Sequence, residues 1–266
     1  MNRGTEDEFA DLLHAVRDGR TESLDELADQ AHRSRFHLSR LLKQRLGFTL
    51  RDFAAAAKVD RGIQGLLEGY SVTQSQWYAG HESPSSYYRA FRRYTGLGPA
   101  QFRAQMRNLA SYLLHRQDEL AALTLVHRSF TPRQHQQDNQ LRIRVTGAQK
   151  RSVLFVALHP EPLVKADPLL GIALLGNHEY TVSAIPDGSY YAMVVEVPRT
   201  TNLRSYFHMS GNRRQLERTP ITFPLVESKT LTLQLRDLIP EDPPITVNLP
   251  KLFLEAAAGR VGLEAV

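Results

Sequence analysis

Two segments near the N-terminus combine basic and aromatic side chains and contain no carboxylate. Residues 30–51 hold six lysines and arginines, and residues 83–103, SPSSYYRAFRRYTGLGPAQFR, hold four arginines, three tyrosines and two phenylalanines. Guanidinium and ammonium groups pair with phosphate oxygens, and arginine also donates two hydrogen bonds to the edge of guanine. The chemistry open to these segments is therefore the binding of a polyanion such as DNA. The alternative is an ordinary solvated basic helix face.

The sequence lacks the motifs of several enzyme classes. It has no cysteine, which excludes disulfides, thiolate zinc sites and cysteine nucleophiles. Its ten histidines are scattered, without a His-Glu-x-x-His pair, and it has neither a phosphate-binding glycine loop nor a Gly-x-Ser-x-Gly elbow. We interpret His178-Glu179 as the start of a strand and expect Glu196 to face outward. We predict no catalytic residue, no metal, no cofactor and no enzymatic activity.

Each basic segment coincides with the second of two short helices. Ser23 and Glu26 have the spacing of a capping box, and a polar break at His32-Arg33 leads to a helix over 34–46. A similar pair occupies 71–94, with a start at Ser71, a turn at Gly80 and a second helix capped by Ser83 or Ser85. Two short helices joined by a three- to four-residue turn form a helix-turn-helix unit.

The alanine-rich segment 48–67 predicts one helix that joins the two units. At 1.5 Å per residue it spans roughly 28 Å. Successive major grooves on one face of a duplex are about 34 Å apart. One chain can therefore present two reading helices to adjacent grooves.

After about Val126 the character of the sequence changes, and 133–140 is a polar, low-complexity segment that we interpret as a linker. Beyond it the apolar pattern has a period of two, which is typical of strands. The run SVLFVAL (152–158) predicts a buried strand, and a turn at 185–189 predicts a hairpin between HEYTVSA and YYAMVVEV. About seven short strands in this part favour an antiparallel β-sandwich.

These patterns predict a multidomain protein with an all-α N-terminal domain followed by an all-β antiparallel sandwich. We place the double helix-turn-helix domain at 1–103, a connecting helix and polar linker at 104–139, the sandwich at 140–255 and a tail at 256–266. Apolar residues spaced by three and four at 104–126 suggest a short coiled coil, although packing against the chain itself is favoured. Without a signal sequence or a membrane-length apolar run, we expect a soluble cytoplasmic protein that binds no membrane.

Residues 23–103 resemble the DNA-binding domain of the AraC/XylS family of bacterial transcription regulators. The matching residues are SLDELADQA, the pattern S-x-x-x-L-S-R-L-L-K from Ser34 to Lys43, and above all 83–103. That last stretch follows the family pattern aromatic-x-x-x-F-(K/R)-(K/R)-x-x-G-x-x-P-x-x-(Y/F)-R. The resemblance implies that helices 34–46 and 84–94 enter the major groove. It implies base-facing roles for Phe36, Ser39, Arg40, Ser85, Ser86 and Arg89.

The positions of the other basic residues suggest contacts with phosphates, which orient a protein without reading sequence. These residues are Arg35, Lys43, Arg92 and Arg93. Tyr87, Phe91 and Tyr94 are predicted to form the packed face of their helix.

The sequence departs from the family pattern in its second unit. Ser75, Gln76 and His81 occupy positions that are usually apolar, and Gly62 and Gly65 weaken the joining helix by up to about 1 kcal/mol each. We therefore expect helix 71–79 to pack loosely, with Trp77 and Tyr78 in place of the missing aliphatic side chains.

Together these observations predict a sequence-specific transcription regulator that binds double-stranded DNA. The C-terminal sandwich, only generically similar to transthyretin-like domains, would sense a small-molecule effector or make protein contacts. RNA polymerase and a second copy of the chain in a homodimer are the further partners considered. The alternative is a protein-interaction module on a decayed helix-turn-helix scaffold that binds DNA only non-specifically.

Overall fold

The computed structural model describes residues 3–21, 23–106, 123–133, 138–150, 152–165, 167–198, 202–225, 227, 229–246, 249, 251 and 252. The chain forms two compact units. The helical unit consists of Met1–Arg103, Pro162–Ala166 and Ile239–Thr246, and the β unit consists of Ala104–Glu161, Asp167–Leu238 and Val247–Val266. The expected order, helical first and β-rich second, is confirmed.

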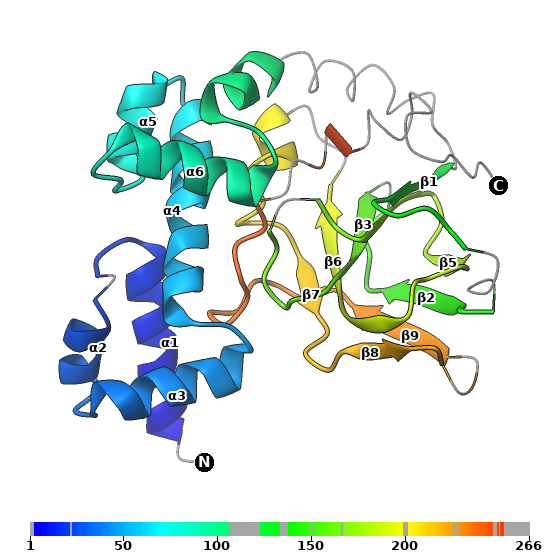
Figure 1. Cartoon of the computed structure of the whole chain (residues 1–266), viewed down its shortest axis with the longest axis horizontal. Coiled ribbons are helices and arrows are strands. Elements are labelled where there is room, and N and C mark those ends of the chain that lie inside the picture. Colours follow the sequence, from blue (N-terminus) through cyan, green and yellow to red (C-terminus); the bar gives the residue numbers. More distant parts are fainter. Residues whose placement is uncertain are drawn as a thin grey trace. The chain divides into compact units, whose positions relative to one another are not determined.

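The helical unit is organised around its longest helix, α4. Its helices include α1 (Arg3–Arg17), α2 (Leu24–Gln30), α3 (Arg35–Leu46), α4 (Leu50–Leu67), α5 (Val72–Tyr78) and α6 (Pro84–Thr95), and the described residues 99–106 are also helical. The pair α2 and α3 lies at one end of α4, and the pair α5 and α6 lies at the other (Figure 1). The two predicted helix-turn-helix units and the helix that joins them are therefore present. Within the described residues, no helix is both long and apolar enough to span a membrane.

Hydroxyl side chains cap the helices at the predicted positions. Ser23, Ser34, Ser71 and Ser83 each accept a hydrogen bond from the backbone N–H three residues further on. This removes one of the donors that every helix N-terminus leaves without a partner. The capping box is complete at Ser71, where Gln74 accepts from the Ser71 N–H. At Ser23 the Glu26 carboxylate accepts from the Thr21 hydroxyl instead.

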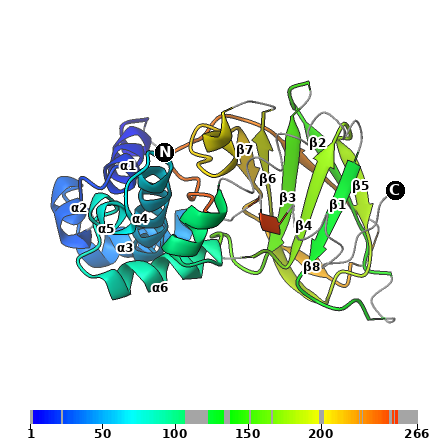
Figure 2. The ribbon, with the colours of Figure 1, turned by 90° about the horizontal axis from the view of Figure 1, so that it is seen from above.

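The β unit is a sandwich of two sheets. Its strands are β1 (Leu123–Arg128), β2 (Leu141–Thr146), β3 (Val153–His159), β4 (Leu170–Leu175), β5 (Glu179–Val182), β6 (Gly188–Val197), β7 (Arg214–Leu216), β8 (Ile221–Phe223) and β9 (Lys229–Gln234), with a short 3-10 helix at Leu203–Tyr206. One sheet has the order β1-β4-β3-β6-β7 with β8 also paired to β6, and the other has the order β5-β2-β9. Figure 2 shows β1, β4 and β3 side by side. Apolar side chains from both sheets share one core, among them Ile143, Val156 and Leu233.

Three features of the β unit differ from the sequence predictions. The strand β1 lies within 104–139, for which the sequence predicts a helix and a linker, so the strands begin earlier than expected. The pair β2–β9 is parallel, whereas the other paired strands described are antiparallel. The predicted hairpin is wrong, because β5 pairs with β2 while β6 pairs with β3 in the other sheet. Turn chemistry identifies the reversal of the chain but not the partner of each strand.

Two segments distant in sequence belong to the helical unit and were not expected there. They are Pro162–Ala166 and Ile239–Thr246. The helical unit therefore includes residues beyond the expected range 1–103. Most of the segment 104–126, whose apolar residues suggested a short coiled coil, lies outside the described residues.

Candidate nucleic-acid interface

The outward face of α3 carries the side chains predicted to touch bases in the first unit. Phe36 is 76% exposed, and Ser39 and Arg40 are also exposed. The opposite face, formed by Leu38, Leu42 and Leu46, is buried. Because residues three and four apart share a helix face, this spacing keeps the polar edge available to a partner.

The outward face of α6 has the same character. Ser85, Arg89, Arg92 and Arg93 are exposed, and Ser86 is half-buried. The packed face predicted for this helix is confirmed, since Tyr87, Phe91 and Tyr94 are each no more than 1% exposed. Phe91 contacts Tyr87 and Phe102 edge-on, with ring centroids 5.5 and 5.3 Å away.

Most cations on these faces have no carboxylate partner. Arg35 lies 3.4 Å from Asp25 in an exposed ion pair, a kind of contact that contributes little in water. Within the described part of the chain, no ion pair with a carboxylate is formed by Arg40, Lys43, Arg89 or Arg92. The first turns of α3 and α6 also contain no acidic residue. Both faces can therefore accept phosphate without first breaking a strong intramolecular pair.

A buried polar contact fixes α5 against α6. Ser75 is fully buried, and its hydroxyl donates to the Val72 carbonyl and lies 2.8 Å from the Tyr87 hydroxyl oxygen. Burial raises the pKa of Tyr87 to about 12. Gly62 of α4 makes room for this tyrosine, because a Cβ there would lie 2.8 Å from the Tyr87 hydroxyl oxygen.

The remaining polar residues of the second unit are also packed. Gln76 is 3% exposed and donates through its amide nitrogen to the His81 carbonyl. The imidazole of His81 lies against the Tyr87 ring and 3.5 Å from the Ser86 hydroxyl oxygen. The Ser86 hydroxyl in turn donates to the Ser83 carbonyl at 2.8 Å. The network therefore reaches a residue predicted to face bases.

The expectation that Trp77 and Tyr78 replace missing core side chains is wrong. Trp77 is 66% exposed and Tyr78 is 41% exposed, whereas Ser75 and Gln76 are buried. The physical reason is space. A Cβ at Gly65 would lie within 3.1–3.4 Å of Tyr70, Tyr78 and Ser75, so α5 packs directly against the backbone of α4 and small side chains suit the contact.

Two cations of α4 stabilise the turn of the second unit, and sequence reasoning assigned them no such role. Lys58 donates to the Gly80 carbonyl at 2.9 Å. Arg61 donates to the Ala79 carbonyl at 3.3 Å and to the Arg17 carbonyl at 2.9 Å. Ala79 and Gly80 stand at the end of α5, where a helix leaves acceptors without partners and favours positive charge. The sequence shows only that positions 58 and 61 are basic, and this does not indicate which carbonyls they contact.

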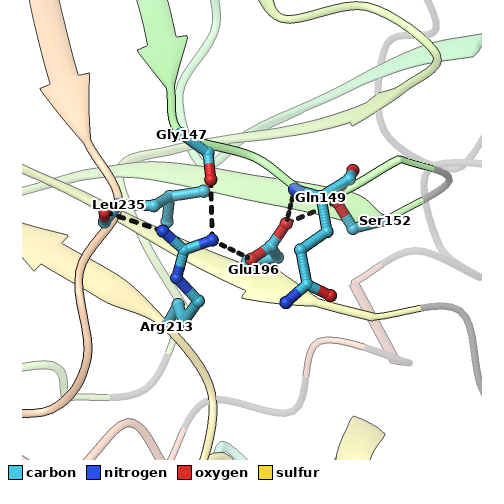
Figure 3. A network of polar contacts seen from close by, with 6 residues as sticks. All are labelled: Gly147, Gln149, Ser152, Glu196, Arg213 and Leu235. Carbon is cyan, nitrogen blue, oxygen red and sulfur yellow. Dashed lines mark hydrogen bonds and ion pairs between the residues drawn. The ribbon is translucent and has the colours of Figure 1, made fainter.

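In the β unit, the prediction that Glu196 faces outward is wrong. Glu196 is 2% exposed and accepts from the Gln149 N–H at 2.6 Å and the Ser152 hydroxyl at 2.7 Å. Arg213 lies 3.4 Å from its second oxygen and also donates to the Gly147 and Leu235 carbonyls (Figure 3). The buried carboxylate is thus satisfied by hydrogen bonds. Among the described residues, no three His, Asp or Glu side chains form a cluster suited to a metal ion.

Comparison with known proteins gives matches to the helical part of the chain. A family model described as a helix-turn-helix domain matches residues 27–105, which include α3 to α6. The bifunctional transcriptional activator/DNA repair enzyme Ada of Escherichia coli (strain K12) is 41% identical over 88 residues. The match covers 33% of this chain and 25% of Ada, so the chain spans about a quarter of the length of that curated relative.

Proposed function

We propose that the chain is a sequence-specific DNA-binding transcription regulator of the AraC type that reads the major groove with α3 and α6. The match of residues 27–105 to a helix-turn-helix family model supports a DNA-binding role. One observation carries the proposal. Arg40 of α3 and Arg89 and Arg92 of α6 are exposed and form no ion pair with a carboxylate of the described chain, while the opposite face of each helix is buried. This is the electrostatic pattern expected of a duplex-binding surface.

The proposed roles follow from position on the two helices. Arg40 and Arg89 lie in the first half of their helices, where a guanidinium can meet the O6 and N7 atoms of guanine. Because the Ser86 hydroxyl donates its proton to Ser83, its oxygen offers lone pairs to an amino group of cytosine or adenine. The remaining proposed base-facing residues are Phe36, Ser39 and Ser85, and the proposed phosphate contacts are Arg35, Lys43, Arg92 and Arg93.

The alternative, an interaction module on a decayed scaffold, rests on the polar residues at 75 and 76. Both side chains are buried and hydrogen-bonded, which favours a packed second unit over a decayed one. We propose that the β unit senses a small ligand or holds protomers or partners together, with RNA polymerase among the partners. The name of Ada gives it two activities, transcriptional activation and DNA repair. The match covers only 25% of Ada, so neither activity is assigned to this chain on the basis of that match.

The proposal is tested by titrating a duplex with the purified chain while fluorescence anisotropy is measured. Arg40→Ala and Arg89→Ala should each weaken specific binding by about 1–3 kcal/mol and relax base preference in one half-site. Arg142→Ala, an exposed arginine of the β unit, is the matched control and should bind as the parent does. Parental affinity in both test variants would mean that α3 and α6 do not read bases. If Arg89→Ala alone bound the duplex as tightly as the parent, α6 would contact the DNA backbone without reading bases.

A further inference from the structure

The segment Ile239–Thr246, here called the strap, belongs to the helical unit although it follows the last strand of the sandwich. We propose that the strap positions the reading helix α6 and thereby determines how tightly the second helix-turn-helix unit binds DNA. The proposal rests on the proposed function, since it assigns a role within the same interface. Its evidence is a set of side-chain contacts at both ends of the strap.

At its first end, the strap is bound by a buried cation. Arg17, the last residue of α1, donates to the Asp242 carbonyl at 2.6 Å and to the Pro240 carbonyl at 3.1 Å. Its guanidinium carbon also lies 5.3 Å from the centre of the Phe53 ring on α4. Burial lowers the pKa of Arg17, and Asp60, Asp242 and Asp18 oppose that shift. A buried charge is costly unless it is paired and hydrogen-bonded, so the strap carbonyls are part of what keeps Arg17 inside.

The same arginine connects the strap to the second helix-turn-helix unit. The Arg17 carbonyl accepts from Arg61, and another nitrogen of Arg61 donates to the Ala79 carbonyl at the end of α5. Gly19 leaves space for this guanidinium, because a Cβ there would lie 2.8 Å from the central carbon of Arg61. Arg17 thus contacts the strap through its side chain and, through its backbone carbonyl, the arginine that supports α5, the partner of α6 in the second unit.

At its second end, the strap contacts α6 directly. The Thr246 hydroxyl donates to the Tyr94 carbonyl at 3.3 Å, and Thr246 and Tyr94 are each 1% exposed. Tyr94 lies in the last turn of α6, where backbone carbonyls have no partner within the helix. The Tyr94 hydroxyl donates to the Asp52 carbonyl at 3.2 Å, and Lys165 lies 3.7 Å from the Asp52 carboxylate. The strap, the end of α6 and the start of α4 thus form one continuous set of contacts.

The strap also has an internal turn that holds its shape. The Asp242 N–H donates to the Ile239 carbonyl at 3.0 Å, and the Asp242 carboxylate accepts from the Ile239 N–H at 3.1 Å. Asp242 and Ile245 are buried. A turn closed by two hydrogen bonds and anchored by buried side chains presents the Pro240 and Asp242 carbonyls to Arg17 in a fixed geometry.

The test compares the full-length parent with Thr246→Val, which keeps the side-chain volume and removes the donor. The assay is hydroxyl-radical footprinting on a duplex selected for binding, and the nucleotides protected by α3 and by α6 are called the α3 block and the α6 block. Thr246→Val should weaken protection of the α6 block by about fivefold, the effect of one lost hydrogen bond. Protection in the α3 block should not change. Arg17→Lys, which keeps the charge but shortens the side chain that brings one nitrogen to both strap carbonyls, should weaken protection of the α6 block. Thr222→Val, a threonine hydrogen-bonded within the β unit, is the control and should leave both blocks as in the parent.

Failure of this inference is distinguishable from failure of the proposed function. A parent that protects no duplex overturns the proposed function. A parent that protects both blocks, with Thr246→Val and Arg17→Lys either matching it or weakening both blocks equally, overturns the strap as a positioning element. Hydrogen exchange gives a readout that does not depend on DNA. Thr246→Val should speed exchange at 92–97 and leave 35–46 unchanged, and parental exchange in both segments would contradict the inference.

Discussion

Gly62→Ala is expected to destabilise the helical unit even though alanine is the better helix former. In a helix interior the substitution by itself gains about 1 kcal/mol. The new Cβ, however, would lie 2.8 Å from the Tyr87 hydroxyl oxygen and 3.0 Å from a ring carbon. Tyr87 is 1% exposed and its hydroxyl contacts Ser75, so the ring cannot withdraw without losing that hydrogen bond. Overpacking costs about 1–3 kcal/mol and the lost hydrogen bond about 1 kcal/mol. The net loss should be about 1–3 kcal/mol.

The assay is urea unfolding of the parent, Gly62→Ala, Tyr87→Phe and the double variant, followed by far-ultraviolet circular dichroism. Phenylalanine lacks the atom nearest to the new Cβ, so the double variant should lose about 1 kcal/mol less than the sum of the single variants. Tyr88→Phe, which removes the hydroxyl of a neighbouring tyrosine that is 45% exposed, is the control and should change stability by less than about 0.5 kcal/mol. A Gly62→Ala protein more stable than the parent, or strictly additive losses, would refute the reasoning.

Three further predictions concern charge. Glu196→Gln should destabilise the β unit by about 2–4 kcal/mol, because it leaves buried donors and Arg213 without their carboxylate. The exposed Glu227→Gln of the same unit is the control and should have little effect on the urea midpoint. Burial lowers the pKa of His159 from its ordinary 6.5 to about 4. Between pH 6.5 and pH 4, this histidine is therefore protonated in the unfolded chain and neutral in the folded chain. Stability should therefore fall by about 2 kcal/mol from pH 7 to pH 5, and urea midpoints of His159→Gln should show a smaller fall. The logarithm of the association constant for a duplex falls linearly with the logarithm of the salt concentration, and Lys43→Ala should make this slope less steep by about 1. An unchanged slope would show that Lys43 does not contact a phosphate.

Local patterns are sufficient to predict much of the helical unit. The caps at Ser34, Ser71 and Ser83 and the packed face of α6 each depend on residues a few positions apart in one helix. The outward faces of α3 and α6 follow from the same periodicity.

The remaining features depend on contacts between residues distant in sequence. The burial of Ser75 and Gln76 in place of Trp77 and Tyr78 is set by the glycines of α4, whose role emerges only when α5 lies against them. The strap contacts join positions more than 150 residues apart, as in the hydrogen bond between Thr246 and Tyr94. Glu196 lies within an apolar strand, where no local signal indicates that Ser152 and Arg213 surround it.

The central claim is that one chain reads duplex DNA with two helices. It is tested most directly by selecting bound duplexes from a random pool with the purified full chain and sequencing the bound fraction. The account predicts two enriched blocks whose centres lie about one helical turn, roughly 10 base pairs, apart. It also predicts that Arg40→Ala and Arg89→Ala each erase the preference in a different block. Failure of the folded chain to enrich any sequence, even at low salt, would contradict the account.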